Sequence, residues 1–174
     1  MNTTNIAIVI PAHNEALTIS KCLASVQTAI EQLPSTITTT VLVVLDSCSD
    51  DTLTLVKHAG VDYLCCDYRC VGQVRDLGIR HAITSGATWL ACTDADSLVT
   101  ADWLTQQIAH INHHPTAMIC GVVDVDDWAH LTPQTRKEYI AHYQDKMGHR
   151  HIHGANLSFS SVAYLAVGGF AALP

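Results

Sequence analysis

The stretch VLVVLDSCSDDTLTLVKHAG, residues 41–60, contains the pattern of a strand, a loop and a helix. Its first five residues are continuously apolar and mostly β-branched, which is typical of a strand buried on both faces of a sheet. SCSDDT then supplies turn formers and helix N-cap candidates, and LTLVKHAG closes on Gly60, a residue type that often ends helices. Residues 41–60 therefore predict one strand–helix unit of an α/β protein.

The same succession of strand and helix repeats along the chain. We expect further strands at 6–10, 61–66 and 87–93, helices at 17–33, 53–60 and 72–86, and a later helix whose apolar face carries Trp103, Leu104, Ile108 and Ile111. Strands that alternate with helices at this spacing form right-handed βαβ units. The predicted fold class is therefore α/β, with a mainly parallel sheet flanked by helices on both faces.

Composition narrows the class of protein. The 174 residues, 48% of them hydrophobic, suffice for one domain with a sizeable core, and a net charge of −7 without a Lys/Arg cluster argues against nucleic-acid binding. The seven cysteines are irregularly spaced, which favours reduced thiols over a disulfide framework. No apolar run approaches the roughly 20 residues of a membrane span, and MNTTNIAIVIPAHNE lacks the features of a secretory signal. We therefore expect a cytoplasmic protein without a transmembrane segment.

Mostly polar residues follow each of the four predicted strands. They are Pro11, Ala12, His13, Asn14 and Glu15, then Asp46 and Ser47, then Asp67 and Arg69, and finally Asp94 and Asp96. In open α/β sheets, ligands bind outside the carboxyl ends of the strands. Carboxylates gathered at one edge repel each other unless a cation offsets them, and oxygen ligands suit Mg²⁺ or Mn²⁺, which also bind phosphate oxygens. The strand ends thus predict a divalent metal that holds a diphosphate.

The acidic stretch at 94–96 also has an ordinary structural interpretation. Asp-Ala-Asp is a common turn sequence, and Asp96 or Ser97 could serve as the N-cap of the helix that follows. The position after the fourth strand is what favours the metal site.

Five motifs in succession resemble the signatures of family 2 glycosyltransferases, which have the GT-A type fold of nucleotide-diphospho-sugar transferases. They are IVIPAHNEA, VLVVLDSCSDDT, CVGQVRDLGIRHA, TDADS and HGANLSFSSVAYLAVGGF. The resemblance implies a metal-dependent, inverting enzyme that transfers a sugar from a nucleotide-diphospho-sugar, with a UDP-sugar favoured, to an unknown acceptor. It also implies one domain over 1–174, with a nucleotide-sugar half at 1–97 and an acceptor-side half at 98–174.

The resemblance assigns nucleotide-binding roles to the first two loops. Pro11, Asn14 and Glu15 match P-x-x-N-E, which lies against the nucleotide. Asp46 matches the second Asp of D-D-G-S-x-D, which accepts a hydrogen bond from the uracil imide. Leu45 stands in place of the first Asp, and Ser47 in place of the Gly. The carboxylate that reads the base is therefore expected to be present.

The later motifs supply the rest of the expected site. Arg75 matches the basic position of G-x-x-x-A-R-N-x-G and is expected to contact phosphate or ribose. TDADS matches D-x-D, so Asp96 would coordinate the Mn²⁺ or Mg²⁺ ion and Asp94 would contact ribose, the metal or its water. The resemblance places three residues near the donor sugar, namely Gly154, Ala155 and Asn156.

Each of these assignments has a structural alternative. Asn14 and Glu15 could simply cap the first helix, because both residue types are common in first helical turns. Arg75 could be a solvated surface charge. Gly168 and Gly169 could do no more than end a helix.

The catalytic base of the family has no match in this sequence. Inverting members place an Asp shortly after the GGF segment, whereas no acid follows Gly169 here. A truncated or split transferase, a base from another polypeptide or subunit, and a base among Asp124, Asp126 and His153 all remain open. We favour truncation or a split protein. A homodimer that covers the apolar end GGFAALP is compatible with either.

Two groups of metal-ligating residue types lie outside these motifs. His149, His151 and His153 would share one face of a strand, but their spacing is no zinc signature. Cys65, Cys66 and Cys70 lack C-x-x-C spacing, so we interpret them as buried thiols. The segment 124–150 predicts a loop and an amphipathic helix on the acceptor side, where Trp128 stacks on a sugar or fills a core gap.

Other classes of protein compete with the transferase. The main alternative is a catalytically incomplete module that binds nucleotide or dimerises. A sugar-1-phosphate nucleotidyltransferase is disfavoured because PAHNEA lacks the G-x-G-x-R pattern of that enzyme's first loop. A Rossmann dehydrogenase is disfavoured because no G-x-G-x-x-G follows a predicted strand.

Overall fold

The computed structural model describes residues 4–113, 118–125, 128–129, 131–143, 146 and 148–171. Its strands are β1 (Asn5–Ala12), β2 (Thr38–Asp46), β3 (Asp62–Cys66), β4 (Trp89–Cys92), β5 (Met118–Cys120) and β6 (Leu157–Ser160). Its helices are α1 (Ile19–Glu31), α2 (Thr52–Ala59), α3 (Val71–Thr84), α4 (Trp103–His113), α5 (Pro133–His142) and α6 (Ser161–Ala166), with a short 3₁₀ turn, η1, at Gly154–Asn156.

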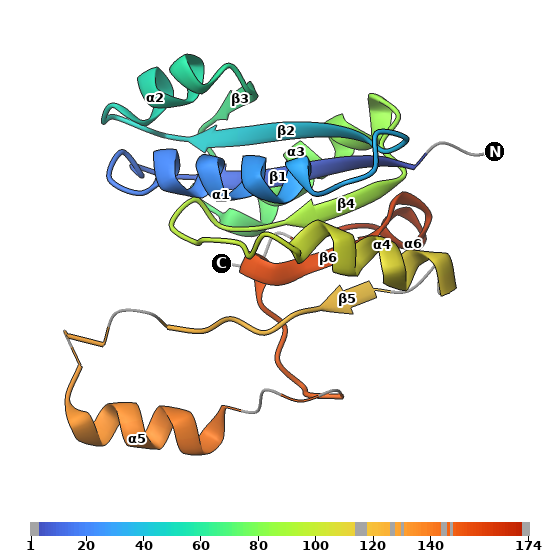
Figure 1. The fold of residues 1–174 in the computed structure, drawn as a ribbon. Coiled ribbons are helices and arrows are strands. Elements are labelled where there is room, and N and C mark those ends of the chain that lie inside the picture. Colours follow the sequence, from blue (N-terminus) through green and yellow to red (C-terminus); the bar gives the residue numbers. More distant parts are fainter. Residues whose placement is uncertain are drawn as a thin grey trace.

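The six strands form one sheet in the order β3-β2-β1-β4-β6-β5 (Figure 1). Strands β1 to β4 are parallel, and β6 runs antiparallel to both β4 and β5. The prediction of a mainly parallel α/β fold is confirmed. After β1 the chain builds outward through β2 and β3 and then returns to place β4 on the other side of β1. This reversal of strand order is the point where α/β sheets bind their ligands.

Helices cover both faces of the sheet, as the sequence predicts. One face of β1, carrying Ile6, Ile8 and Ile10, packs with residues of α1, α2 and α4. The opposite face, with Ala7 and Val9, packs with residues of α3 and α6. Because successive side chains of a strand point to opposite faces, β1 alone serves two apolar clusters.

Gly78 sets the distance between α3 and the sheet. A Cβ atom at Gly78 would lie 2.6 Å from Cγ1 of Val9 and 2.7 Å from Cγ2 of Val44. Both neighbours are β-branched and stiff, so only a glycine lets the helix approach the sheet this closely. The close approach packs α3 directly against β1 and β2.

Some predicted boundaries are wrong for identifiable reasons. Strand β1 continues through Pro11 to Ala12, because it pairs with β4 only as far as Val9 and a missing N–H is tolerated where one neighbour is absent. Helix α1 begins at Ile19, and Leu17 before it is exposed. Strands β5 and β6 were not expected.

The thiol and helix interpretations at the edges of the fold also need correction. Cys65 is exposed, and Cys66 and Cys70 are half-buried, so they are not the buried thiols that we expected. Helix α5 lies in the segment where we expected an amphipathic helix, but it buries none of its residues and stands apart from the sheet, so it has no buried apolar face (Figure 1). Gly168 and Gly169 follow α6 with positive φ angles of 84° and 90°, in keeping with helix termination. Within the described ranges, no helix has the length and apolar character needed to cross a membrane.

Candidate functional site

A cavity of about 800 Å³ opens at the carboxyl edge of the sheet. It contains seven of the predicted nucleotide and metal residues, namely Pro11, Asn14, Glu15, Asp46, Arg75, Asp94 and Asp96. They come from the ends of β1, β2 and β4 and from α3. The structure therefore brings together three strand ends and one helix that are far apart in the sequence, at the point where the strand order reverses.

The backbone around this cavity adopts an unfavourable conformation in three places. Asn14, Ser47 and Arg69 have φ angles of 57°, 52° and 50°, and within the described part of the chain they are the non-glycine residues with positive φ. All three line the cavity. Such conformations cost about 1–3 kcal/mol each and gather at functional sites. Ser47 also occupies the position where the family has glycine, which adopts positive φ freely.

The first and second loops hold each other in place. The Asn14 side-chain oxygen accepts hydrogen bonds from the backbone N–H groups of Ser49 at 2.8 Å and Asp50 at 3.3 Å. In return, Asp50 accepts from the N–H of Ala16 at 3.0 Å. Asn14 thus ties two loops together, so the alternative that it caps the first helix is wrong; the N-cap residue of α1 is Thr18.

Glu15 contributes to both helix α1 and the cavity. Its carboxylate accepts a hydrogen bond from the Thr18 hydroxyl at 2.8 Å, and its N–H donates to the Thr52 hydroxyl at 2.8 Å. The alternative of helix capping therefore describes only part of what Glu15 does, because the same residue also lines the cavity.

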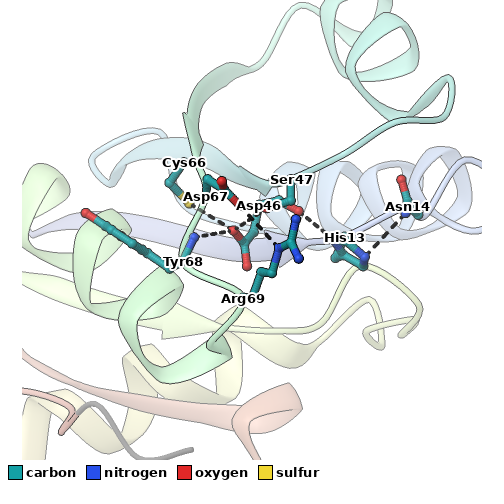
Figure 2. A network of polar contacts seen from close by, with 8 residues as sticks. All are labelled: His13, Asn14, Asp46, Ser47, Cys66, Asp67, Tyr68 and Arg69. Carbon is teal, nitrogen blue, oxygen red and sulfur yellow. Dashed lines mark hydrogen bonds and ion pairs between the residues drawn. The ribbon is translucent and has the colours of Figure 1, made fainter.

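Asp46 is a buried acid at this site, with 5% of its surface exposed. Figure 2 shows its carboxylate between Cys66, Tyr68 and Ser47. Its Oδ1 accepts from the Tyr68 N–H at 2.8 Å and lies 3.7 Å from the Cys66 Sγ. Burial, and then the Asp46 charge, raise the pKa of the Cys66 thiol to about 11, so the thiol stays protonated as a donor at neutral pH. In the described chain only Oδ1 of the two carboxylate oxygens accepts hydrogen bonds, which leaves Oδ2 for a ligand.

His13 lies beside Asp46 in a defined tautomer. Its Nδ1 is 2.6 Å from the Asp46 carbonyl oxygen, which can only accept, so Nδ1 carries the proton. Nε2 lies 3.3 Å from the Asn14 side-chain nitrogen, which donates to it. Figure 2 shows the imidazole between the two loops.

Arg75 is buried beneath the cavity and pairs with Asp94. Only 9% of Arg75 is exposed, so the alternative of a solvated surface charge is wrong. Its Nη2 donates to Asp94 Oδ1, and its buried Nε has no hydrogen-bond partner among the described residues. A Cβ atom at Gly154 would overlap the guanidinium, so the glycine of the GAN segment lies directly against Arg75.

Asp96 is exposed at the mouth of the cavity, where its Oδ1 accepts from the Ser97 hydroxyl at 3.2 Å. Helix α4 begins only at Trp103, so the prediction that Asp96 or Ser97 caps it is wrong, although the Ser97 N–H does bond to the Asp94 carbonyl at 3.1 Å in a turn. No group of three or more ligating side chains is preformed in the described ranges. One or two carboxylates suffice for Mg²⁺ or Mn²⁺, because water and phosphate complete their coordination, so Asp96 and Asp94 fit such an ion.

A second hollow of about 420 Å³ adjoins the cavity and shares Asp96 with it. Ala155 and Asn156 line this hollow rather than the main cavity. The Asn156 amide accepts from the Trp103 indole at 3.0 Å and donates to the Val122 carbonyl at 2.9 Å, so it shapes the wall.

The three candidate catalytic bases differ in their position relative to the cavity and the second hollow, and one lies outside the described residues. Asp124 lines the second hollow, with its Oδ1 accepting from the Val125 N–H at 2.8 Å. His153 lines neither the cavity nor this hollow; its Nε2 lies 3.3 Å from the Tyr143 hydroxyl. Asp126 lies outside the described residues. Asp124 is therefore the candidate that the described structure brings next to the main cavity, in the hollow that shares Asp96 with it.

Part of the cavity wall was not predicted. Ser49 comes from the second loop, Cys70 is the N-cap residue of α3, and Val71 and Val74 come from the first turn of that helix. The three residues at the start of α3 are neutral, and although they lie within the motif CVGQVRDLGIRHA, no individual role was expected for them. The signal that finds them is positional, because a helix that follows a strand in a βαβ unit begins at the carboxyl edge.

Comparison with known proteins places this arrangement in a family. The profile of Glycosyl transferase family 2 matches residues 7–166, which is most of the chain. No curated protein sequence is similar enough to count as a relative.

Three solved structures illustrate the likeness of fold. Mannosyltransferase PcManGT from Pyrobaculum calidifontis, in complex with GDP-Man and Mn²⁺, has a TM-score of 0.66 and 16% identity over 96% of this chain and 47% of that chain. TarS 1-349 from S. aureus, in complex with UDP-GlcNAc, has a TM-score of 0.59 and 20% identity over 71% and 36%. Glucosyl-3-phosphoglycerate synthase from Mycobacterium tuberculosis, in complex with UDP, has a TM-score of 0.58 and 16% identity over 90% and 57%.

The present chain spans between 36% and 57% of the length of these three structures. At such identities the likeness shows the fold, while the profile match over residues 7–166 shows the family. The chain therefore belongs to glycosyltransferase family 2 and has the GT-A fold of that family.

Proposed function

We propose that this chain binds a UDP-sugar with Mn²⁺ or Mg²⁺ and transfers the sugar, with inversion, to an acceptor. The observation that carries the proposal is the cavity at the strand-order reversal, which unites a buried acid, Asp46, with the exposed acid Asp96. In this proposal residues 1–97 form the nucleotide-sugar half of one domain, and residues 98–174 form the acceptor side.

The surroundings of Asp46 favour a base that offers an N–H donor. Oδ1 is already engaged by Tyr68 and Cys66, whereas Oδ2 points to no described donor. A uracil N3–H would satisfy Oδ2, and a base without a donor there would leave a buried carboxylate oxygen unpaired, which costs about 1–3 kcal/mol. Guanine also offers an N–H donor, so UDP must be tested against GDP.

Three features of the chain suit the diphosphate. Asp96 and Asp94 would hold the metal ion, which screens the negative charge that develops on the departing diphosphate. The Arg75 side chain lines the cavity, where its positive charge would attract a phosphate or its N–H groups would bond a ribose oxygen. The first turns of α3 line the cavity, and a helix N-terminus favours anions.

Asp124 is our proposed proton acceptor. In the transfer, the acceptor hydroxyl oxygen forms a bond to the anomeric carbon, the bond from that carbon to the diphosphate oxygen breaks, and the hydroxyl proton passes to the Asp124 carboxylate. Attack from the side opposite the leaving group gives inversion. Asp124 supports this role because it lines the hollow that adjoins Asp96.

The donor half of the proposal is tested by thermal unfolding with UDP, GDP and NAD, each with and without Mn²⁺. We expect only UDP with Mn²⁺ to raise the midpoint; at 100 times Kd the stabilisation is about 2.7 kcal/mol, or roughly 5–10 °C for a domain of this size. Asp96→Ala should abolish this shift, whereas Asp62→Asn, which removes an exposed carboxylate at the start of β3, should preserve it.

The catalytic half is tested by release of UDP from UDP-sugars in the presence of candidate acceptors. Turnover that Asp124→Asn reduces by about 10²-fold or more, without loss of UDP binding, would support the assigned base. Binding of UDP without any turnover would favour the alternative of a catalytically incomplete module. No shift with any nucleotide would overturn the proposal.

A further inference from the structure

A third hollow, of about 390 Å³, lies beside α5. Its lining comes from α5 and from the segment that follows β5, and consists of Asp124, Val125, Trp128, Arg136, Tyr139, Ile140 and Tyr143. It shares Asp124 with the second hollow, which in turn shares Asp96 with the donor cavity. The second hollow therefore lies between the proposed donor site and the third hollow, which Trp128 lines.

The aromatic side chains of this third hollow are held in order by one another. Trp128 meets Tyr139 edge-on at 5.3 Å, and Tyr139 stacks on Tyr143 at 5.2 Å. Tyr143 stacks in turn on His151 at 4.6 Å, and its hydroxyl accepts from the Val123 N–H at 2.7 Å. An aromatic wall that is fixed from behind in this way loses little side-chain entropy when a ligand binds to it.

Charged groups accompany the aromatic wall. The Arg136 guanidinium lies over the Trp128 ring at 5.3 Å from the centroid, and the Asp124 carboxylate lies at the junction with the second hollow. An apolar face beside a charged hydrogen-bond donor and acceptor matches a pyranose ring, whose C–H face is apolar and whose edge carries hydroxyl groups. The volume falls within the range of small-molecule sites, about 300–1,000 Å³.

Helix α5 makes no other contribution that would explain these residues. It buries none of its side chains and stands away from the sheet (Figure 1). Aromatic residues on such a helix do not serve the two core clusters, in which neither Tyr139 nor Tyr143 takes part.

We propose that this third hollow is an acceptor subsite for a saccharide, and that the acceptor is an oligosaccharide rather than a single sugar. One sugar unit packs against Trp128 and Tyr139, with its hydroxyls bonded to Arg136, while the chain continues through the second hollow and brings its reacting hydroxyl to the donor side. The second hollow separates the aromatic wall from the donor cavity, so a monosaccharide cannot occupy both ends. This inference rests on the proposed transferase function.

The chain carries a built-in reporter for this subsite. Of its three tryptophans, Trp89 and Trp103 are 1% and 7% exposed, whereas Trp128 is half-buried and lines the hollow. Acrylamide quenching of tryptophan fluorescence therefore reports mainly on Trp128. The probes are cello-, malto- and chito-oligosaccharides of one to six units.

We expect oligosaccharides of at least one of these series to protect the fluorescence from quenching, with protection that increases from one to about three units. Arg136→Ala should weaken the apparent affinity by about tenfold, or about 1.4 kcal/mol. Ile152→Ala, which removes an exposed apolar side chain outside the hollow, should leave it unchanged. Trp128→Phe should abolish the signal without changing the unfolding midpoint, because Trp128 belongs to neither core cluster.

Two results would overturn the inference. The first is the absence of protection by every series at millimolar concentration while UDP with Mn²⁺ still raises the unfolding midpoint, in which case the donor proposal survives and the acceptor proposal fails. The second is protection by phospholipid vesicles and not by any oligosaccharide, which would assign the hollow to a membrane surface. Failure of the UDP shift itself would be a failure of the proposed function and not of the sugar-binding test, which needs no nucleotide.

Discussion

Arg75 and Asp94 form an ion pair in which the arginine side chain is 11% exposed and the aspartate side chain 34% exposed. Both residues line the main cavity, and the pair joins α3 to the loop after β4. Loss of the arginine leaves a half-buried carboxylate without its cation, which costs about 3–5 kcal/mol when the pair is fully buried. Because Asp94 reaches solvent, we expect Arg75→Met to destabilise the fold by about 1–3 kcal/mol.

The measurement is urea unfolding of Arg75→Met, Asp94→Asn and the double variant. We expect the double variant to be more stable than the sum of the single effects predicts, because it leaves no unpaired charge. Arg80→Met is the matched control on the same helix. The Arg80 side chain is 48% exposed, against 11% for Arg75, so solvent screens its pair with Asp76 and its loss should cost clearly less than the loss of Arg75. Equal losses of unfolding free energy in Arg75→Met and Arg80→Met would contradict the expectation that burial makes the Arg75 ion pair contribute more to stability.

Gly154 permits Arg75 to lie where it does, and we expect Gly154→Ala to weaken UDP binding by about tenfold or more, because the new methyl group must displace the guanidinium from under the cavity. The control is Gly60→Ala. Gly60 has a φ of 69°, and a Cβ atom there would meet no neighbour within 4 Å, so this substitution costs about 1 kcal/mol of stability from backbone strain alone. Calorimetric titration with UDP and Mn²⁺ should show near-normal affinity for Gly60→Ala; equal weakening in both variants would reduce the effect to global destabilisation.

The parallel core of the fold and the acidic part of the site could be predicted from the sequence because both follow from local patterns. Runs such as VLVVL identify strands, and the carboxyl ends of parallel strands meet at one edge, which places Asp46, Asp94 and Asp96 along the same edge of the sheet. Strand β6 escaped prediction because LSFS is short and its partner β4 lies far away in sequence. The sequence around Gly154 does not predict its contact with Arg75, because the two residues are far apart in the chain and meet only in the folded protein.

Substitutions of Ser47 measure the backbone strain at this position of the cavity. Its φ of 52° is unfavourable for any residue with a Cβ atom, while its hydroxyl donates to Asp67 and lies 3.3 Å from the Asp46 Oδ1. Ser47→Ala and Ser47→Gly both remove the hydroxyl, but only the glycine relieves the backbone. We therefore expect Ser47→Gly to be more stable than Ser47→Ala by about 1–2 kcal/mol in urea unfolding. Equal stabilities would show that this backbone conformation carries no strain.

Asp50 makes the hydrogen bonding between the loops after β1 and β2 dependent on pH. The Thr52 hydroxyl, and then the N–H groups of Thr52 and Ala16, lower the pKa of Asp50 below its ordinary value of 3.8. A carboxyl with a lowered pKa in the folded state stabilises the fold above its unfolded pKa, and this contribution is lost as the pH falls through the folded value. Both carboxylate oxygens accept hydrogen bonds, so an asparagine at this position would turn its NH₂ group toward a donor.

We therefore expect Asp50→Asn to unfold at a lower temperature than the wild type at pH 7, and the difference between the two midpoints to shrink as the pH falls below about 4. Asp51→Asn removes a charge from the same loop, but the Asp51 side chain makes no capping hydrogen bond to α2, so its midpoint at pH 7 should lie closer to that of the wild type. Thermal unfolding of the three proteins between pH 7 and pH 3 makes the comparison. A gap for Asp50→Asn that stays constant over this range would show that the carboxylate charge is not what holds the loops, and that the hydrogen-bonding shape of the side chain is sufficient.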